Sequence, residues 1–252
     1  MTDSSQNKTS EAVIIAAGQG TRIAENITVS HKCLVPILGK PLIGYIVQNL
    51  IDSGIQKVHI VTGYDGLTLQ SSIKTLRFPV GLDFIQNDRW EDGNGTSVLS
   101  AQRVVDSEYF ILTMADHWFS KEITQIINEP KFAFPNILAV DSWMDQINDI
   151  DDATKVQMGD HNRILDIDKK LKKYNAIDCG IFRFKSADIF SSLEKSIQSK
   201  EFSLSGGVRQ LIQNEKMFYV DMKGNPWQDV DTWSDLQKTI EKINSHKERS
   251  HS

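Results

Sequence analysis

The stretch from Val13 to Arg22, VIIAAGQGTR, constrains the fold more than any other part of the sequence. Its apolar, β-branched start is typical of a buried strand, and Gly18-Gln19-Gly20 predicts a tight turn that leads into a helix. Backbone N–H groups in such a turn are not covered by side chains, so they can converge on phosphate oxygens. Arg22 can add a planar guanidinium fork for a second phosphate contact. An ordinary strand-to-helix turn with an exposed arginine is the alternative that this stretch alone leaves open.

Strands are expected to alternate with helices over the first half of the chain. Apolar runs predict strands over 13–17, 58–63, 82–87 and 109–116, and helical spacing predicts helices after Pro41, through Ser72 and over 97–105. This alternation favours βαβ crossovers and a mostly parallel sheet. Ligands bind beyond the carboxyl ends of the strands in such sheets. The rule places three segments on one rim: Gly18–Arg22, Asn87–Ser97 and Asp116–His117.

The second half of the chain has a different rhythm. Its pattern predicts a strand over 136–140, a hairpin over 153–168, a strand over 175–184 and a helix over 185–198. A helix near 202–212, a strand over 217–222 and a last helix capped by Thr232 or Ser234 follow, with a frayed tail after Asn244. No composition shift marks a linker, so we expect a disordered lead over 1–10 and a single domain over 11–245. Its nucleotide half covers about 11–135, and its lid-like acceptor half covers about 136–245.

Composition and charge restrict the function. Over 252 residues, 40% are hydrophobic and 24% charged, which is ordinary for a globular protein. The net charge of −5 and the isoelectric point near 5.7 argue against a general nucleic-acid or anionic-membrane surface. No apolar run reaches the length of a membrane span, and the polar N-terminus lacks a signal-peptide core. Cys33 and Cys179 lack metal-ligand spacing, so we expect buried, reduced thiols and a cytoplasmic protein.

Acidic residues stand at two points where a metal would be useful. Asp116 ends an otherwise apolar strand, where a carboxylate without a partner would be costly to bury. A hard cation removes that cost, and Mg²⁺ prefers one or two carboxylates together with waters and phosphate oxygens. Asp229 and Asp231 flank Val230, so both face one side of an extended chain. Helix capping is the alternative role for either member of this pair.

Lysines near these segments can meet the phosphates. Lys32 and Lys40 follow the glycine turn, and either could reach a triphosphate as a point charge. A solvated surface position is the alternative for each. Lys155 stands among acids in DIDDATKV, at the start of a strand, from where it would point back over the rim.

The motifs resemble those of a known enzyme family. AAGQGTR followed by KCLVP-x-x-GKPLI closely resembles the nucleotidyltransferases that join an NTP to a sugar or alditol phosphate, and the similarity extends from residue 13 to about 240. The segments NDRWEDGNGTSVLSA, LTMADHWFS, DDATKV, YNAIDCGIF, EFSLS and WQDVDTWSDL are most similar to the CTP:inositol-1-phosphate cytidylyltransferase branch. The resemblance implies an α/β fold of the nucleotide-diphospho-sugar transferase type, with a Rossmann-like, mostly parallel central sheet flanked by helices.

The resemblance also implies roles for particular residues. Asp116 would match the metal-binding aspartate, Asp229 or Asp231 the second acid, and Arg22 and Lys32 the catalytic cations that hold the triphosphate. Many relatives have proline immediately before this lysine, where the present chain has His31. The expected nucleotide-binding residues are Ala16, Ala17, Gly18, Gln19, Gly20, Thr21, Asn87, Gly93, Asn94, Gly95, Thr96 and Ser97. Lys155 would contact the acceptor phosphate and Asp178 its hydroxyls, while His117 would orient or pack.

The base contact is open. The amide of Asn87 has the donor and acceptor needed for the cytosine edge, and a simple turn role is the alternative.

The implied reaction is the transfer of CMP from CTP to an alditol phosphate. An oxygen of the acceptor phosphate attacks the α-phosphorus in line and pyrophosphate leaves, with Mg²⁺ as cofactor. Inositol 1-phosphate is the expected acceptor, with phosphocholine, glycerol phosphate or a hexose 1-phosphate as alternatives. The chain ends soon after its last helix, so a membrane phosphotransferase that uses the product is expected to be a separate protein. A homodimer is left open.

Two functions of other classes compete with this reading. A non-catalytic nucleotide-binding module would not need the full set of acids and cations. A dinucleotide-dependent oxidoreductase also begins with strand, glycine turn and helix. Here the spacing is G-x-G-T-R, and no acid follows the second strand, which runs into Gly63-Tyr64.

Overall fold

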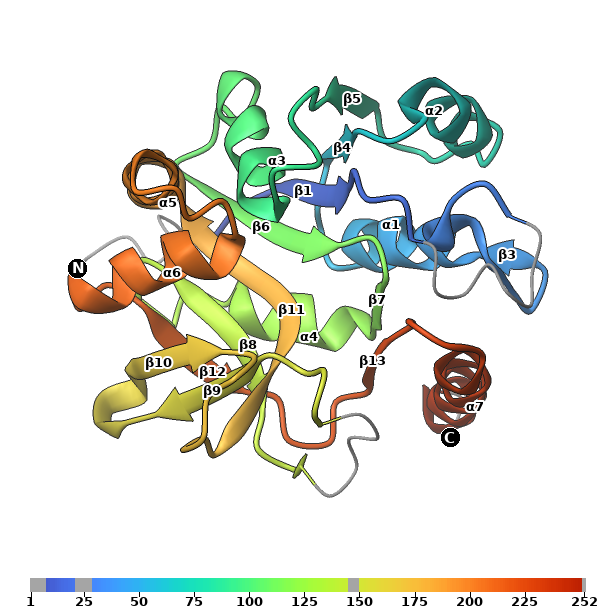
Figure 1. The fold of residues 1–252 in the computed structure, drawn as a ribbon. Helices are drawn as coiled ribbons and strands as arrows, with labels where there is room; N and C mark the ends of the chain where they lie inside the picture. Colours follow the sequence, from blue (N-terminus) through green and yellow to red (C-terminus); the bar gives the residue numbers. More distant parts are fainter. Residues whose placement is uncertain (1–7, 21–28, 145–149, 251–252) are drawn as a thin grey trace.

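A nine-stranded mixed sheet forms the centre of the molecule in the computed structural model, which describes residues 8–20, 29–144 and 150–250. Its main path is β10 (Ile164–Asp168), β9 (Lys155–Met158), β11 (Ala176–Lys185), β6 (Tyr109–Met114), β1 (Glu11–Ala16), β4 (Lys57–Thr62) and β5 (Leu82–Gln86) (Figure 1). β8 (Ile137–Asp141) pairs with β11 and with β12 (Phe218–Asp221). β6, β1, β4 and β5 are parallel, whereas β11 is antiparallel to β6. The predicted α/β class with a mostly parallel, mixed sheet is therefore confirmed.

Side chains of β1 alternate between two hydrophobic cores, one on each face of the sheet. Ala12 and Ile14 belong to one core, and Val13 and Ile15 belong to the other. Helices α1 (Leu42–Asp52), α2 (Gly66–Lys74), α4 (Lys121–Ile127) and α7 (Trp233–Ser250) supply the first core. Helices α3 (Asn94–Ser100), α5 (Ser186–Gln198) and α6 (Leu204–Gln213) supply the second. A strand buried on both faces explains the continuous apolar run before the glycine turn.

Helix ends follow local rules in the sequence. Pro41 precedes α1, and Gly54, with a φ of 99°, follows its end in the left-handed region. Thr232 and Asp235 form a capping box before α7, because each accepts the other's backbone N–H. The expected frayed tail after Asn244 was wrong, since α7 continues to Ser250. The helix predicted over 97–105 begins earlier, as α3, and ends in a 3₁₀ turn over Ala101–Arg103.

The structure describes part of the lead predicted over residues 1–10. Residues 1–7 lie outside the described part of the chain, but Thr9 is buried. Its backbone exchanges two hydrogen bonds with the side-chain amide of Asn128, at 2.9 and 2.8 Å. This contact ties the start of β1 to the end of α4.

Short strands that the sequence did not predict surround the carboxyl end of the sheet. β7 (His117–Phe119) pairs with β13 (Trp227–Asp229) in antiparallel fashion, with Asp229 opposite His117. β2 (Pro36–Ile37) and β3 (Lys40–Pro41) form a small ladder after the 3₁₀ turn Lys32–Leu34. Another 3₁₀ turn, Asp160–Asn162, joins β9 to β10. The β7–β13 pair brings distant acids together, as described below.

At the amino end of β1, a buried carboxylate and its hydrogen bonds fix the strand. Glu11 accepts hydrogen bonds from Nε2 of His59, at 2.6 Å, and from the backbone N–H of Ser107, at 2.8 Å. Burial alone would raise the pKa of Glu11, but the bonds from Ser107 and His59 lower it from 4.5 to about 2. Because this pKa is lower in the folded state, the carboxylate stabilises the fold above about pH 4.5, and the stability is lost as the pH falls towards 2.

We predict that Glu11→Gln lowers the free energy of unfolding at pH 7 by about 3 kcal/mol, which corresponds to this shift of the Glu11 pKa. The loss of stability between pH 5 and pH 2 should be flatter in the variant than in the wild type, as measured by urea unfolding. Asp106→Asn is the matched control, because exposed Asp106 binds the same Lys57 that contacts Glu11. Equal pH dependence in Glu11→Gln and the wild type would contradict the role of this carboxylate.

Candidate active site

Two adjoining cavities open at the carboxyl end of the parallel strands. The larger encloses about 490 Å³ and the smaller about 310 Å³. They share four lining residues: Asn94, Met114, Asp116 and Asp231. Asp116 follows β6 in the turn to β7, at the rim where the strand order predicts ligand binding. A molecule in one cavity would therefore meet a molecule in the other beside these two carboxylates.

The smaller cavity is built on the glycine turn. Ala16, Ala17, Gly18, Gly20 and Ser97 line it, together with Asn94, whereas Gln19 is exposed. Gly20 is required there for two reasons: its φ is 62°, and a Cβ would lie 2.5 Å from Cβ of Lys32. The turn thus presents backbone towards the cavity. The predicted residues Thr21 and Arg22 lie outside the described part of the chain.

Hydrogen bonds of Asn87 hold the segment that leads into α3, which contributes residues to this cavity. The side-chain amide of Asn87 donates to Thr96 and Ser97, and its oxygen accepts the backbone N–H of Arg89 at 3.0 Å. Asn87 is buried and lines neither cavity, so its expected contact with the base needs correction: its polar atoms brace the loop. Sequence reasoning missed Trp90, which lines the smaller cavity.

The glycines of this loop serve packing. Gly93 and Gly95 lie against Phe202, and the backbone N–H of Gly95 donates to its carbonyl at 2.9 Å. Thr96 donates to backbone carbonyls of the same loop, at 2.9 and 2.8 Å. These three predicted nucleotide-binding residues line neither cavity.

Lys32 lies between three aspartates from distant parts of the chain. Its Nζ is 2.9 Å from Asp116 and 3.6 Å from Asp229, and it donates to Asp231. Burial would lower the pKa of Lys32, but the charges of Asp116, Asp229 and Asp231 raise it. For Asp116, burial acts to raise the pKa, while the charges of Lys32 and His117 lower it. The lysine is therefore cationic and the carboxylate of Asp116 anionic at neutral pH.

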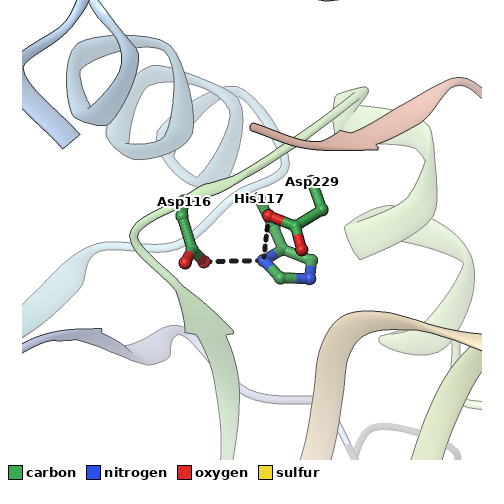
Figure 2. Close-up of side chains that lie close together, drawn as sticks. All are labelled: Asp116, His117 and Asp229. Atoms are coloured by element: carbon green, nitrogen blue, oxygen red, sulfur yellow. Dashed lines mark hydrogen bonds and ion pairs between the residues drawn. The ribbon is translucent and has the colours of Figure 1, made fainter. Parts of the chain in front are cut away.

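A candidate metal site adjoins this ion pair. Ligand atoms of Asp116, His117 and Asp229 lie within 4.8 Å of one another (Figure 2). The ring Nδ1–H of His117 donates to Asp116 at 2.7 Å and lies 3.9 Å from Asp229. One carboxylate oxygen of Asp229 is buried without a hydrogen-bond donor among the described residues. A divalent cation would satisfy that oxygen, so the donor set fits a hard metal ion. Asp231 contacts Lys32 and is not part of this set.

His117 owes its position to a glycine in β11. A Cβ on Gly180 would lie 2.3 Å from the imidazole, and the φ of Gly180 is 74°. Burial would lower the pKa of His117, but the carboxylates of Asp229 and Asp116 raise it to about 9. Burial raises the pKa of neighbouring Asp178 to about 6, although the backbone N–H of Gly180 donates to it. Without a metal, His117 is thus an imidazolium that donates to Asp116.

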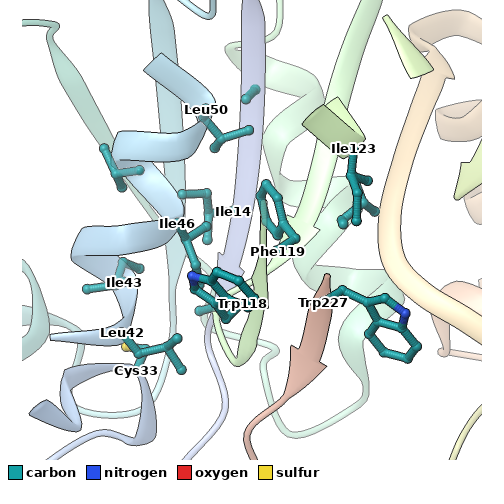
Figure 3. Close-up of a cluster of buried hydrophobic side chains, with 14 of the residues drawn as sticks. Ile14, Cys33, Leu42, Ile43, Ile46, Leu50, Trp118, Phe119, Ile123 and Trp227 are labelled. Carbon is teal, nitrogen blue, oxygen red and sulfur yellow. The ribbon is translucent and has the colours of Figure 1, made fainter. Parts of the chain in front are cut away.

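Packing of aromatic residues holds the two short strands. Trp118, Phe119 and Trp227 are buried in the core that α1 and α4 cover, and their side chains fill the space beside Ile46 and Ile123 (Figure 3). The ring of His117 also stacks on Trp227, with 8° between the planes. The apolar members of β7 and β13 thereby fix His117 and Asp229, which belong to the same two strands.

The wall of the larger cavity includes two lysines, Lys169 and Lys242. Asp178, His117 and Lys169 line it, and Nζ of Lys169 is 2.9 Å from Asp152. Lys155, the lysine predicted for this place, lines neither cavity. Its buried ammonium donates to the carbonyls of Asp151, Ala153 and Lys169. The lysine-rich run 169–173 was the available sequence signal, but nothing in it distinguishes a cavity residue from a solvated one.

Residues 11–246 match the family model described as Nucleotidyl transferase. The chain belongs to the nucleotidyl transferase family. It is therefore an enzyme of the transferase class, and the predicted resemblance is confirmed. Nucleotidyl transferases typically use a divalent metal, which agrees with the cluster around Asp116.

Several curated proteins are similar to this member of the family. The Bifunctional IPC transferase and DIPP synthase of Thermococcus kodakarensis is 30% identical over 90% of this chain and 49% of its own length. The protein of the same name from Rubrobacter xylanophilus is 28% identical, over 92% and 51%. The Bifunctional protein GlmU of Methanococcus maripaludis is 26% identical, over 87% and 51%. The chain thus spans about half the length of the curated relatives it matches.

Solved structures share the fold. The inositol-1-phosphate CTP transferase from T. maritima matches with a TM-score of 0.85 and 24% identity, over 95% of this chain and 96% of that one. A putative glucose-1-phosphate thymidylyltransferase from Bacillus anthracis matches with a TM-score of 0.78 and 20% identity, over 92% and 94%. The fold is therefore that of the nucleotide-diphospho-sugar transferases. Among the described residues, no helix combines the length and apolarity that a bilayer span requires.

We predict that Asp229→Asn weakens Mn²⁺ binding at least about tenfold, because it removes charge from the oxygen that lacks a donor. Electron paramagnetic resonance of free Mn²⁺ measures this without any turnover. Asp52→Asn is the control, since exposed Asp52 on α1 pairs with Gln48 away from the cavities. Unchanged Mn²⁺ affinity in Asp229→Asn would remove Asp229 from the metal site.

Proposed function

We propose that this nucleotidyl transferase moves CMP from CTP to an alditol phosphate, with inositol 1-phosphate as the acceptor, and releases pyrophosphate. The observation that carries the proposal is the pair of cavities that share Asp116 and Asp231. Transfer between two anionic substrates needs two adjoining pockets that bring the phosphates of both substrates together beside positive charge. Here Lys32, and a metal ion held by the acids, would supply that charge. The names of the curated relatives from Thermococcus and Rubrobacter, and of the T. maritima structure, support the choice of acceptor.

The smaller cavity suits the nucleotide. Backbone at Gly18–Gly20 can bind phosphate oxygens, and Lys32 on the cavity wall adds a buried positive charge. By family resemblance, Arg22 and Thr21 would complete this phosphate site. Trp90 offers a flat apolar wall for the base or ribose, and none of the described residues that line the cavity favours cytosine over other bases.

The larger cavity suits a phosphorylated polyol. Carboxylates such as Asp178 accept hydrogen bonds from hydroxyls, and Lys169 can meet the acceptor phosphate. Lys155 then has a supporting role, because it binds the carbonyl of Lys169 itself at 2.9 Å. On this proposal the nucleotide half covers about 11–135 and the acceptor half about 136–245, with the last acids contributed by the acceptor half.

Asp116 and Asp229 would hold Mg²⁺, with His117 or Asp231 beside them. When bound, Mg²⁺ would neutralise the phosphates and polarise the α-phosphorus towards attack. Lys32 adds charge on the side of the leaving pyrophosphate, which lowers the barrier to its departure. His117 orients Asp116 through the bond from Nδ1 and carries no covalent intermediate. The protein thus acts by positioning two substrates and stabilising charge, as is general for transfers at phosphorus.

A different acceptor is the second candidate, because relatives named GlmU are similar over the same part of the chain. A matrix of four NTPs against inositol 1-phosphate, glucose 1-phosphate, glucosamine 1-phosphate, glycerol 3-phosphate and phosphocholine, measured by pyrophosphate release, separates the two. We expect CTP with inositol 1-phosphate to give the highest kcat/KM. Faster turnover with UTP and a hexosamine phosphate would overturn the proposal. A cytoplasmic location and a membrane phosphotransferase that uses the product remain parts of it, and a homodimer stays open.

We predict that Asp116→Ala lowers kcat at least about a hundredfold, because Asp116 faces both cavities and the metal cluster. Pyrophosphate release under saturating CTP and Mg²⁺ measures the effect, with Asp52→Ala as control. An undiminished rate would exclude Asp116 from the chemistry.

Two lysines should separate binding from stability. Lys169→Gln should raise KM for the acceptor about tenfold with little change in melting temperature, since it removes one phosphate cation at an exposed position. Lys155→Gln should lower the melting temperature, because it leaves buried carbonyls without their shared donor. Steady-state kinetics and thermal unfolding of both variants test this. The reverse pattern would restore Lys155 as the acceptor-binding residue.

A further inference from the structure

Trp143, in the segment after β8, is conspicuous in the larger cavity. Five large hydrophobic residues stay exposed in the described part of the chain: Leu38, Leu67, Trp143, Leu165 and Trp233. Of these, Trp143 alone lines either cavity, and it is 47% exposed. Because apolar side chains such as Phe182 and Leu204 line the same cavity, the indole of Trp143 adds to an apolar lining that a ligand can cover.

The backbone around Trp143 fixes the indole. A Cβ on Gly224 would lie 3.0 Å from Cζ3 of the ring, so the indole lies against bare backbone, and the φ of 79° at Gly224 also favours glycine. The buried carboxylate of Asp141 joins the two tryptophans of the cavity. It accepts the backbone N–H of Trp143 at 2.8 Å and the indole N–H of Trp227 at 2.9 Å. Such a supported ring needs little ordering when a ligand binds.

Several other residues of the cavity wall are polar. Asp178, Thr154, Asn225 and Lys169 line the same cavity. A cavity with an aromatic wall and a few polar groups fits a ligand with one apolar face and several hydroxyls. A cyclic polyol or a pyranose has this character, because its ring C–H groups form a flat face and its hydroxyls point outward.

We infer that Trp143 is the specificity residue that selects a cyclic acceptor, by stacking its indole on the C–H face of the ring. The inference rests on the proposed transfer to an alditol phosphate and names the feature of the acceptor that the enzyme reads. Glycerol 3-phosphate offers no such face, so it gains little from the indole. Phosphocholine would meet the ring through its cation instead, which is a different mode of recognition.

Acceptor kinetics of Trp143→Ala provide the test. The variant should raise KM for inositol 1-phosphate and glucose 1-phosphate roughly tenfold, leaving KM for CTP and any turnover of glycerol 3-phosphate within about twofold. Trp143→Phe should recover most of the loss, since it keeps an aromatic face. Trp233→Ala is the matched control, because Trp233 has the same exposure and lines neither cavity. Equal KM values for the ring acceptors in Trp143→Ala and the wild type would overturn the inference, as would a larger effect on phosphocholine.

A binding measurement separates this inference from the proposed reaction. Inositol 1-phosphate and glucose 1-phosphate are titrated, with a non-hydrolysable CTP analogue and Mg²⁺, while tryptophan fluorescence is recorded. We expect a saturable change that Trp143→Phe removes and Trp233→Phe keeps. If this fluorescence change is seen but the enzyme releases no pyrophosphate from CTP, the stacking on Trp143 is supported and the proposed reaction is rejected. If neither ring compound gives a fluorescence change that depends on Trp143, the stacking role of Trp143 is rejected, whichever reaction the enzyme catalyses.

Discussion

Negative charge gathered at one edge of the sheet is the constraint that organises this protein. Asp116 comes from the middle of the chain and Asp229 and Asp231 from near its C-terminus, and all three converge within reach of one ammonium group, that of Lys32. Like charges so close together are tolerated only where cations are supplied. Because these carboxylates need positive charge beside them, the site can bind a metal ion, and the metal ion can in turn bind phosphates. Stability and chemistry are thus coupled in this cluster.

Two features of the fold bring these acids together: the parallel strand order and one short antiparallel strand pair. Parallel strands put the glycine turn and Asp116 on one rim, which is a consequence of crossover topology. His117 and Asp229 are brought to the same rim in a different way, by the antiparallel pairing of β7 with β13. Buried Trp118 and Trp227 belong to the same two strands as His117 and Asp229, so the packing of the indoles fixes the strands that carry these two polar groups to the larger cavity.

Much of this arrangement was readable in the sequence, and what was not depends on tertiary contacts. The alternating apolar runs predicted the strands and their parallel order, and the apolar strand ending in Asp116 predicted the rim. Periodicity could not reveal β7 and β13, because three-residue strands carry too little pattern. That Lys169 lines the larger cavity, and Lys155 does not, was equally hidden in the sequence. Both lysines stand in charged runs, and only the turn that bends Lys169 towards the cavity, with its carbonyl held by Lys155, distinguishes them.

The bond network of Glu11 at the far end of β1 has a consequence for the phosphate turn. Glu11 joins neighbours on both sides, because His59 lies in β4 and Ser107 precedes β6. These contacts pin β1 lengthwise between its two partners. A slip by a single residue would carry the glycine turn about 3.3 Å along the strand axis and exchange its two core faces. The hydrogen bonds of Glu11 at one end of β1 therefore determine the position of the glycine turn at the other end.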